Sequence, residues 1–311
     1  MDAKLNILKK YNISELNMLG MGMEAEVYAY GTDRVLKIYN GLTNTRKQET
    51  LKAFYDALRR EEAGPELPRT YSILQEEGRV VTMEKRISGK SLQDALPAMT
   101  REQQEAAMKH YLMAQLQLQK ITIFPPLEGY KLFSDNKLST TRQKDWYHFL
   151  KQYIMIKHEE AGFYFARDVE QYEEKLQRLL SLLSSDYDGP YSLIHGDYYP
   201  GNVLVDDEGK VTGVIDFGIM TMYGDPLFDI ACGWLYFDMY NVLEANLTER
   251  YLNVIMNTLG EGVRGRLYLY VLVNSILTAN LYSQQCNDGH YLWCVGHLNN
   301  PRYLDGMANF R

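Results

Sequence analysis

The sequence is poor in the residues and patterns that mark several common classes of protein. Only 3 of its 311 residues are cysteine, and Cys232, Cys286 and Cys294 lie far apart with no C-x-x-C spacing, which predicts neither a disulfide framework nor a zinc site. With 9 prolines and 23 glycines, the composition excludes collagen-like and low-complexity chains. The N-terminus lacks a signal-peptide pattern, and the most apolar stretch, residues 267–282, is interrupted by polar side chains. We therefore expect a cytoplasmic protein with no membrane partner.

An excess of basic residues is missing as well. The chain has 33 Lys and Arg against 40 Asp and Glu, a formal net charge of −7, which is the wrong sign for binding nucleic acid through its phosphates. Residues 1–88 hold 14 basic and 13 acidic side chains, so the remaining 19 basic and 27 acidic ones lie in residues 89–311. This imbalance favours a small, cationic partner for the second part of the chain. The alternative is that most of these charges only solvate helix faces.

What is present is an ordinary globular composition, 46% apolar with 25 tyrosines, whose periodicity changes near residue 90. The first part alternates as strands do, with Gly-rich turns between the runs and one helical stretch at residues 45–62. The expected strands are residues 16–19, 26–30, 34–39, 69–75 and 79–85.

The second part has mainly helical periodicity. Helices are expected at residues 101–120, 143–160 and 168–184, a short hairpin at 202–215, and further helices from about residue 229. These patterns predict an α+β protein of two lobes. A five-stranded antiparallel sheet with one helix forms residues 1–86, and a mostly helical lobe forms residues 87–311, with a helical insertion at about 121–190.

One constellation of polar residues carries chemistry. His195-Gly196-Asp197 begins a loop that reaches Asn202 five residues after Asp197, and Asp216-Phe217-Gly218 follows the partner strand of the hairpin. Because a hairpin of this length brings its two ends together, Asn202 and Asp216 can converge as oxygen ligands for Mg²⁺. Asp197 then lies close enough to accept a hydroxyl proton. The order and spacing match those of kinase catalytic motifs, which predicts phosphoryl transfer.

The start of the chain provides an independent check. Gly20 and Gly22 lie in a turn that is similar to the loop over ATP phosphates in kinases, although Ala25 replaces its third glycine, and Lys37 occupies the position of the third-strand lysine. For Lys37 the helix offers Glu49 as a carboxylate partner, but a solvent-facing Glu49 fits the helical periodicity equally well.

The end of the fifth strand is expected to form the connector between the lobes. Met83, Glu84 and Lys85 lie there, and we expect adenine to dock along their backbone.

Two spacings argue against a protein kinase. About seventy residues separate the helix at 101–120 from His195, and only six lie between Gly218 and Asp225, too few for an activation segment. A small acceptor is therefore the better prediction.

Taken together, the motifs LIHGD, PGN, VIDFG and GDPLFDIA resemble those of the aminoglycoside phosphotransferase family, which also includes choline kinase-like enzymes. The resemblance spans about residues 14–235. It implies a bilobal protein kinase-like fold, with ATP or GTP bound together with Mg²⁺. The implied roles are Asp197 as the base, Asn202 and Asp216 as metal ligands, and Lys37 as the phosphate contact.

The resemblance also implies supporting residues. His195 would orient Asp197, and Asp225 and Asp229 would buttress the catalytic loop.

The identity of the acceptor is less constrained. For a polycationic aminoglycoside, Glu159, Glu160 and Asp238 are the acidic candidates. For a quaternary ammonium compound, aromatic residues near the motifs, such as Tyr198 and Trp234, would form a cation–π site, although ordinary core packing is the alternative role for them.

The leading hypothesis is thus an ATP-dependent O-phosphotransferase acting on an aminoglycoside or aminocyclitol antibiotic and conferring resistance. The alternatives are a kinase of choline or ethanolamine, of a macrolide, of a sugar or of an amino alcohol, and a nucleotide-binding scaffold without turnover.

Overall fold

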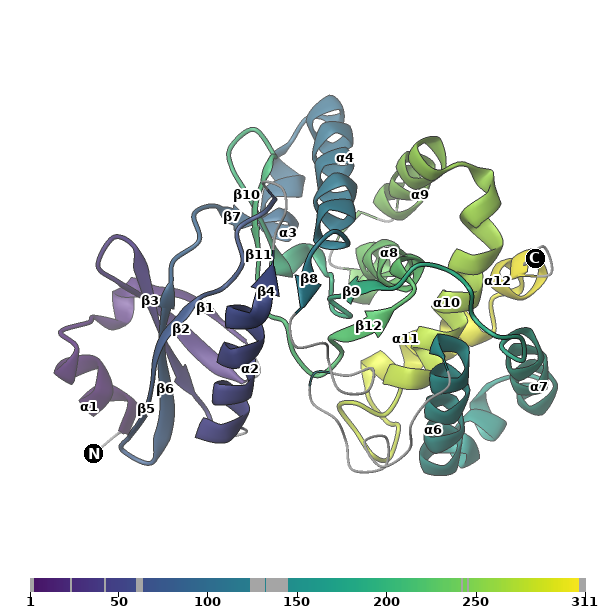
Figure 1. The fold of residues 1–311 in the computed structure, drawn as a ribbon, viewed down its shortest axis with the longest axis horizontal. Helices are drawn as coiled ribbons and strands as arrows, with labels where there is room; N and C mark the ends of the chain where they lie inside the picture. Colours follow the sequence, from purple (N-terminus) through teal and green to yellow (C-terminus); the bar gives the residue numbers. More distant parts are fainter. Residues whose placement is uncertain are drawn as a thin grey trace.

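The protein is built from a sheet-containing part and a larger helical part, arranged along the long axis with the chain termini at opposite ends (Figure 1). The computed structural model describes residues 3–22, 24–41, 43–59, 64–123, 132, 145–241, 243–244 and 246–307. Much of the predicted insertion at 121–190 therefore lies within the described residues, but segments 124–131 and 133–144 lie outside them.

The first part contains a five-stranded antiparallel sheet of order β1-β2-β3-β6-β5, as predicted. The expected strand boundaries differ from the observed ones by at most two residues. The strands are β1 (Met18–Met21), β2 (Ala25–Tyr30), β3 (Arg34–Tyr39), β5 (Thr70–Glu76) and β6 (Arg79–Lys85). A short helix that the sequence reading missed, α1 (Ala3–Lys10), precedes the sheet.

The two faces of the sheet have different partners. Leu36 and Ile38 pack with Ile7 and Leu8 of α1 in a small core of their own. Because side chains alternate along a strand, Lys37 and Tyr39 point to the opposite face. On that face α2 (Thr45–Ala57) covers the sheet. The charged side chain of Lys37 therefore faces α2.

Helix α2 is shorter than the expected stretch of residues 45–62. Asn44 caps its N-terminus by accepting a hydrogen bond from the N–H of Lys47 at 2.9 Å. It ends at Ala57, where Leu58–Arg59 (β4) pairs with Thr122–Ile123 (β8) instead. Pairing with a strand more than 60 positions later thus replaces the last turn that helical periodicity predicted.

The second part is mostly helical, which agrees with the predicted fold class. Two small sheets lie next to the catalytic motifs, one of order β11-β10-β7 and one of β12 paired with β9. The helices are α3 (Leu92–Ala95), α4 (Arg101–Leu118), α6 (Trp146–Asp168), α7 (Tyr172–Leu182), α8 (Pro226–Leu235), α9 (Asn246–Leu259), α10 (Arg264–Thr278), α11 (Gly289–Leu298) and α12 (Pro301–Gly306). The strands are β7 (Lys90–Ser91), β9 (Ser192–Ile194), β10 (Val203–Val205), β11 (Val211–Val214) and β12 (Met222–Gly224).

Helix α10 is the centre of the large core. Every residue from Leu267 to Thr278 is buried, and the helix contacts α6, α8, α11 and α12. A helix that is apolar on all sides is enclosed by its neighbours, which accounts for the most apolar stretch of the sequence. Within the described residues, no helix combines the length and apolarity needed to cross a membrane.

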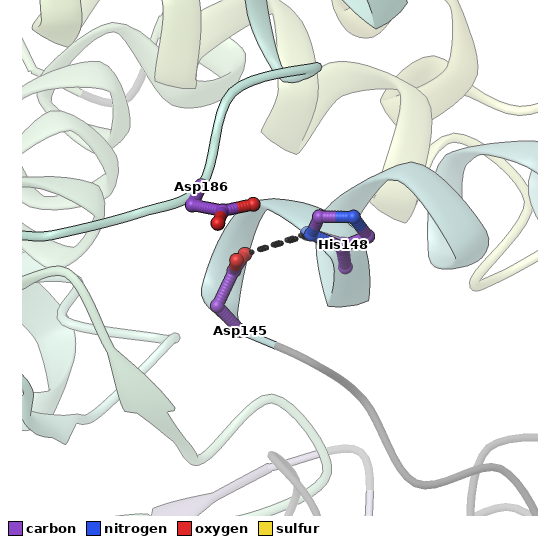
Figure 2. A group of neighbouring side chains, drawn as sticks. All are labelled: Asp145, His148 and Asp186. Carbon is purple, nitrogen blue, oxygen red and sulfur yellow. Dashed lines mark hydrogen bonds and ion pairs between the residues drawn. The ribbon is translucent and has the colours of Figure 1, made fainter.

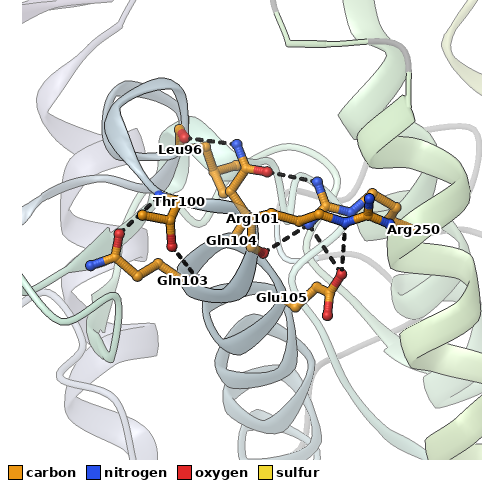
Figure 3. Close-up of polar contacts among 7 residues, drawn as sticks. All are labelled: Leu96, Thr100, Arg101, Gln103, Gln104, Glu105 and Arg250. Carbon is orange, nitrogen blue, oxygen red and sulfur yellow. Dashed lines mark hydrogen bonds and ion pairs between the residues drawn. The ribbon is translucent and has the colours of Figure 1, made fainter.

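Helices α4 and α9 are joined by a polar network (Figure 3). Arg250 of α9 donates to the Gln104 side chain at 2.6 Å and to the carbonyl of Arg101 at 2.9 Å. Gln104 in turn donates to the carbonyl of Leu96 at 3.1 Å. This network fixes α9, which follows the catalytic motifs in sequence, against the first long helix of the second part.

The two parts contact each other through backbone and aromatic side chains. The backbone of Glu66 exchanges hydrogen bonds of 2.9 Å with Thr212 and Val214 of the hairpin. On α2, Phe54 and Tyr55 pack against Phe217, with ring centroids 5.7 and 5.9 Å apart. The residue after Asp216 is therefore held directly by the helix of the sheet.

Candidate active site

The loop after β9 carries His195, Gly196 and Asp197. Gly196 has φ +79°, and a Cβ at this position would collide with the carbonyl of Met220. Only glycine tolerates both the conformation and the close approach. The loop ends in a 3₁₀ turn, Pro200–Asn202, that leads into β10.

The carboxylate of Asp229, on α8, holds this loop in place. It accepts the N–H of His195 at 3.1 Å and the N–H of Gly196 at 2.9 Å. The residue is 1% exposed, and burial raises the pKa of Asp229, while His195 and the two N–H groups oppose that shift. The role expected for Asp229, support of the catalytic loop, matches these contacts.

His195 links the loop to the hairpin. Its Nδ1 lies 3.2 Å from the N–H of Asp197 and its Nε2 lies 2.9 Å from the carbonyl of Ile215. In these contacts Nδ1 is the acceptor and Nε2 is the donor. His195 therefore orients the loop and holds it against the strand that precedes Asp216.

Asp197 and Asn202 contact each other. The Asn202 amide donates to the carbonyl and to Oδ2 of Asp197, both at 3.0 Å. Asp197 reaches solvent, but the surrounding protein desolvates it enough to raise its pKa to about 6, with Asp216 adding to the shift and His195 opposing it. A carboxylate of this pKa can accept a proton near neutral pH.

Asp216 has strained backbone and an unengaged carboxylate. Its φ is +70°, a conformation that non-glycine residues rarely adopt. Within the described residues its carboxylate makes no hydrogen bond or ion pair, whereas its charge acts on Lys37 and Asp197. Ile215, just before it, donates to the carbonyl of Asn202 at 2.9 Å, so the two predicted metal ligands are brought to the same place.

Lys37 is paired within the sheet. Its Nζ lies 3.1 Å from Oε2 of Glu84 on β6, and Oε1 of Glu84 accepts the Thr82 hydroxyl at 2.8 Å. Burial alone would lower the pKa of Lys37, but Glu84 raises it well above its usual value, with Tyr39 and Asp216 contributing. The lysine is thus held as a cation that faces Asp216.

The expected pairing of Lys37 with Glu49 is wrong. Glu49 is exposed on α2, and the neighbouring Gln48 is the buried residue, which accepts the hydroxyl of Tyr39 at 3.0 Å. Glu49 was the expected partner because the corresponding lysine of kinases pairs with a glutamate on the helix. The register of β3 and β6 offered a signal, since Lys37 lies opposite Thr82 and Glu84 shares the face of Thr82.

The residues of the expected connector lie within the sheet. Strand β6 is flanked on both edges by β3 and β5, and the N–H groups of Lys85 and Arg86 donate to carbonyls of Arg69 and Asp33 at 2.8 Å. The backbone of Met83, Glu84 and Lys85 is thus engaged within the sheet, and docking of adenine along these residues stays a prediction. Within the described residues, the N–H of Ile87 is the next one without a hydrogen-bond partner.

Gly20 and Gly22 lie where the sequence predicted them, at the β1–β2 hairpin. Gly20 pairs with Val27, and Gly22 donates to the carbonyl of Ala25 at 2.9 Å. A Cβ at Gly20 would meet no atom within 4 Å. The space beside this turn is thus open.

Asp225 has a different environment from the one expected. It caps α8 by accepting the N–H of Leu227 at 2.9 Å, and it accepts the hydroxyl of Tyr270 at 2.6 Å. Arg266 lies 3.4 Å away. These contacts fix the start of α8 to α10, directly after β12, which pairs with β9 before the catalytic loop.

The aromatic acceptor candidates Tyr198 and Trp234 are core residues, so those two predictions are wrong. Tyr198 is fully buried, and its hydroxyl donates to the carbonyl of Tyr111 at 2.8 Å, while the Tyr111 hydroxyl donates to the carbonyl of Tyr198. Trp234 is 1% exposed, and its Nε1 donates to the carbonyl of Thr248 at 3.1 Å. Both side chains are therefore enclosed in the core.

Other rings form a continuous row near Asp197. Centroid distances along it are 6.4, 6.2, 5.4 and 5.0 Å. The charge of Asp197 acts on the first, second and last members, and the last is 54% exposed. We call these residues the aromatic row: Tyr199, Tyr236, Trp293, His290 and Tyr282. The sequence signal was too weak to find Tyr282, because no motif precedes it.

Two of the acidic acceptor candidates, Glu159 and Glu160, lie on α6. Glu160 pairs with Lys157 at 2.8 Å and accepts the amide of Asn280 at 3.0 Å, two residues before Tyr282. Glu159 is exposed on α6, and the side chain of Asp238 lies outside the described residues. Asp216 and Asp229 are the carboxylates that raise the pKa of Asp197.

The family to which the chain belongs follows from a match to a family model. The model described as the phosphotransferase enzyme family matches residues 15–269, so the chain is a member of that family. The predicted enzyme class, a phosphotransferase that uses a nucleoside triphosphate and acts on an alcohol group, is confirmed with it. A comparison with curated protein sequences finds no match.

Solved structures of low sequence identity share the fold over nearly the whole chain. ADP-bound aminoglycoside phosphotransferase APH(2'')-Ib has 18% identity, a TM-score of 0.60 and coverage of 99% of each chain. The GDP and kanamycin complex of APH(2'')-IIIa has 15% identity, a TM-score of 0.54 and 98% coverage of each chain. APH(3'')-Id from Streptomyces rimosus, with ADP and streptomycin, has 14% identity, a TM-score of 0.51 and coverage of 89% of this chain and 99% of that one. The predicted kinase-like fold is thereby confirmed.

Proposed function

We propose that the protein transfers the γ-phosphoryl group of ATP, or of GTP, to a hydroxyl of a small molecule, with Asp197 as the base. The observation that carries the proposal is the group formed by Asp197, Asn202 and Asp216. A carboxylate of raised pKa touches the asparagine, and the asparagine backbone is bonded to the residue before a strained, unengaged aspartate. Phosphoryl transfer needs such positioning and charge neutralisation more than covalent help.

Asn202 and Asp216 fit a magnesium ion. The Asn202 amide nitrogen is used by Asp197, which leaves its Oδ1 for a cation, and the Asp216 carboxylate is unengaged within the described residues. Mg²⁺ prefers oxygen ligands of this kind. When bound there, it would neutralise charge on the nucleotide phosphates. Asn202 also keeps Asp197 in one orientation, so that Oδ1 of Asp197 can receive the acceptor proton.

Lys37 and the β1–β2 turn would hold the nucleotide. Lys37 is charged and fixed by Glu84, which suits a phosphate contact, and the turn at Gly20 and Gly22 has open space beside it. The backbone N–H of Ile87 would donate a hydrogen bond to the purine base. On this assignment the predicted division into residues 1–86 and 87–311 separates nucleotide binding from acceptor binding.

For the acceptor, an aminoglycoside or aminocyclitol antibiotic is the first candidate, and phosphorylation would then confer resistance. Its support is the similarity in fold to the kanamycin and streptomycin complexes named above. The acidic excess of residues 89–311 points the same way.

A second candidate rests on the aromatic row. A row of rings beside the catalytic carboxylate suits a quaternary ammonium alcohol such as choline, by cation–π attraction, or a macrolide, by apolar contact. No feature of the aromatic row specifically favours a sugar or another amino alcohol as the acceptor.

The test is ADP release by the purified enzyme over a panel of aminoglycosides, macrolides and choline, with Mg²⁺ and with ATP or GTP as donor. Asp197→Ala is the blank. We expect turnover with at least one alcohol-bearing member and none with the variant. Silence of every aminoglycoside together with turnover of choline or a macrolide would replace the first candidate with the second. Nucleotide binding without turnover on any compound would favour a scaffold.

A further inference from the structure

A histidine and two aspartates face one another away from the candidate active site. Asp145 caps the N-terminus of α6, His148 lies in its first turn, and Asp186 follows the end of α7. One donor atom of each lies within 4.8 Å of the other two. Figure 2 shows the two carboxylates and the imidazole ring turned toward a common space.

Asp145 is the buried member, with 7% of its surface exposed. Its Oδ1 accepts the backbone N–H of His148 and lies 3.1 Å from the ring Nδ1. Its Oδ2 is buried and, among the described residues, has no partner in hydrogen-bonding geometry. Burial opposes ionisation, but the His148 groups and the nearby N–H of Tyr187 lower the pKa of Asp145. A buried carboxylate oxygen that lacks a hydrogen-bond partner is costly unless a cation meets it.

The backbone around these three residues is already fixed. The N–H of Trp146 donates to the hydroxyl of Tyr191 at 2.9 Å. The rings of Tyr147 and Tyr187, each next to a member of the group, lie 5.0 Å apart, and Tyr187 also packs on Tyr191 at 5.3 Å. The start of α6 and the segment after α7 are thus held together independently of the three side chains, so little ordering is needed for them to bind an ion.

A capping interaction explains part of the arrangement. Asp is a favoured N-cap residue, and a contact with a histidine three positions later is expected on the first turn. Capping uses only Oδ1 of Asp145, however. It does not explain the buried Oδ2.

We propose that Asp145, Nδ1 of His148 and Asp186 bind one divalent ion of the zinc class. One nitrogen and two carboxylate oxygens suit Zn²⁺, which commonly takes three protein ligands and completes its coordination with water. Mg²⁺ and Ca²⁺ prefer sets of oxygen only. His148 and Asp186 are partly exposed, which gives the ion access from solvent and leaves room for water.

The ion would act as a brace. It would join the first turn of α6 to the segment that leads into β9 and the catalytic loop, across 41 positions from Asp145 to Asp186. Since binding favours the folded state, zinc should raise the melting temperature without taking part in phosphoryl transfer.

The test is zinc titration by calorimetry of the nucleotide-free protein, with an excess of Mg²⁺ present to occupy the oxygen ligands Asn202 and Asp216. The cysteines are buried, so thiolates do not compete. We expect one zinc ion per chain with a dissociation constant of about micromolar or below. A visible absorption band should appear when Co²⁺ replaces zinc, and the melting temperature should rise. A wild-type protein that binds no zinc would overturn the proposal.

Three variants localise the site. His148→Ala and Asp186→Asn each remove a ligand, and Asp145→Asn lowers the charge while preserving the N-cap. Each should weaken zinc binding by at least about tenfold and abolish the zinc-dependent rise in melting temperature. His110→Ala on α4, whose ring contacts the carbonyl of Gly209, is the matched histidine control and should bind zinc as the wild type does. Unchanged zinc affinity in the His148 and Asp186 variants would refute the assignment. Because Asp145→Asn keeps the N-cap of α6, a loss of zinc binding in this variant is not explained by loss of the helix.

Discussion

Two regions of the candidate active site, one around Lys37 and one along the aromatic row, are built from different chemistry. Around Lys37, the groups are charged and fixed: Glu84 holds the lysine, Thr82 holds Glu84, and Asp216 faces both. Along the aromatic row, the groups are rings, and the row ends in the half-exposed Tyr282. A nucleotide triphosphate and its metal require the first kind of surface, whereas the second kind selects an acceptor by shape and ring contact.

The comparison changes the meaning of the acidic second lobe. Several of its carboxylates are engaged with local cations, as Glu249 is with Arg302 and Glu261 with Arg264. A summed charge of a region therefore says little about the charge at its site. The acceptor is selected by the side chains close to Asp197, and these include rings of the aromatic row.

The largest expected effect is loss of the base. Asp197→Asn keeps the size of the side chain and its contact with Asn202, but it cannot accept the acceptor proton. We expect kcat to fall by about 10²–10⁴-fold with the dissociation constant for nucleotide nearly unchanged. Steady-state ADP release and a nucleotide-binding titration measure the two quantities. A loss of nucleotide affinity as large as the loss of kcat would show that Asp197 binds the nucleotide and does not act as the base for the acceptor.

The second prediction concerns pH. Asp197 must be ionised to act as a base, and its pKa is raised to about 6, first by burial. The value of kcat/KM should therefore be level above pH 7 and fall tenfold per unit below about pH 6, because the protonated fraction then grows. The measurement is a pH profile of kcat/KM for the acceptor at saturating nucleotide. A profile that stays level down to pH 5 would mean that proton transfer to Asp197 does not limit the reaction.

The catalytic loop was predictable because its chemistry fixes its spacing. Asp197, Asn202 and Asp216 lie on a short hairpin, and the distance between them along the chain nearly determines their distance in space. The five-stranded sheet was predictable for the same reason, since short turns leave little freedom of register. Gly196 then follows from the close approach of the Met220 carbonyl.

Other features depend on contacts that spacing does not determine. The pairing of Lys37 with Glu84 follows from which strand lies beside β3 and which face each residue takes. Tyr198 is buried against Tyr111 of α4, 87 positions earlier in the chain. Trp234 is buried against Thr248 of α9, 14 positions later. Tyr282 reaches the neighbourhood of Asp197 only because α10 returns the chain there. Long-range packing decides all of these cases.

The third prediction sharpens the nucleotide side of the comparison. Glu84→Gln removes the charge that holds Lys37 while keeping its shape, so kcat/KM for nucleotide should fall by about tenfold. Glu49→Gln, on the exposed face of α2, is the matched control and should be unchanged. The melting temperature of each variant is measured as well, because an unpaired buried lysine also lowers stability. Equal losses in both variants would restore α2 as the source of the lysine's partner.

The smallest expected effect lies on the acceptor side. Tyr282 is 54% exposed, and its ring contacts only the edge of the row, at 5.0 Å from His290. Tyr282→Ala should therefore leave folding and nucleotide affinity unchanged and raise KM for a cationic or apolar acceptor by about three- to tenfold, the range of an exposed cation–π contact. Tyr282→Phe should keep the wild-type KM, because the ring face is what binds. An unchanged KM in Tyr282→Ala, with the acceptor identified by ADP release, would remove the aromatic row from acceptor binding and leave the acidic surface of α6, with Glu160 beside Asn280, as the next place to mutate.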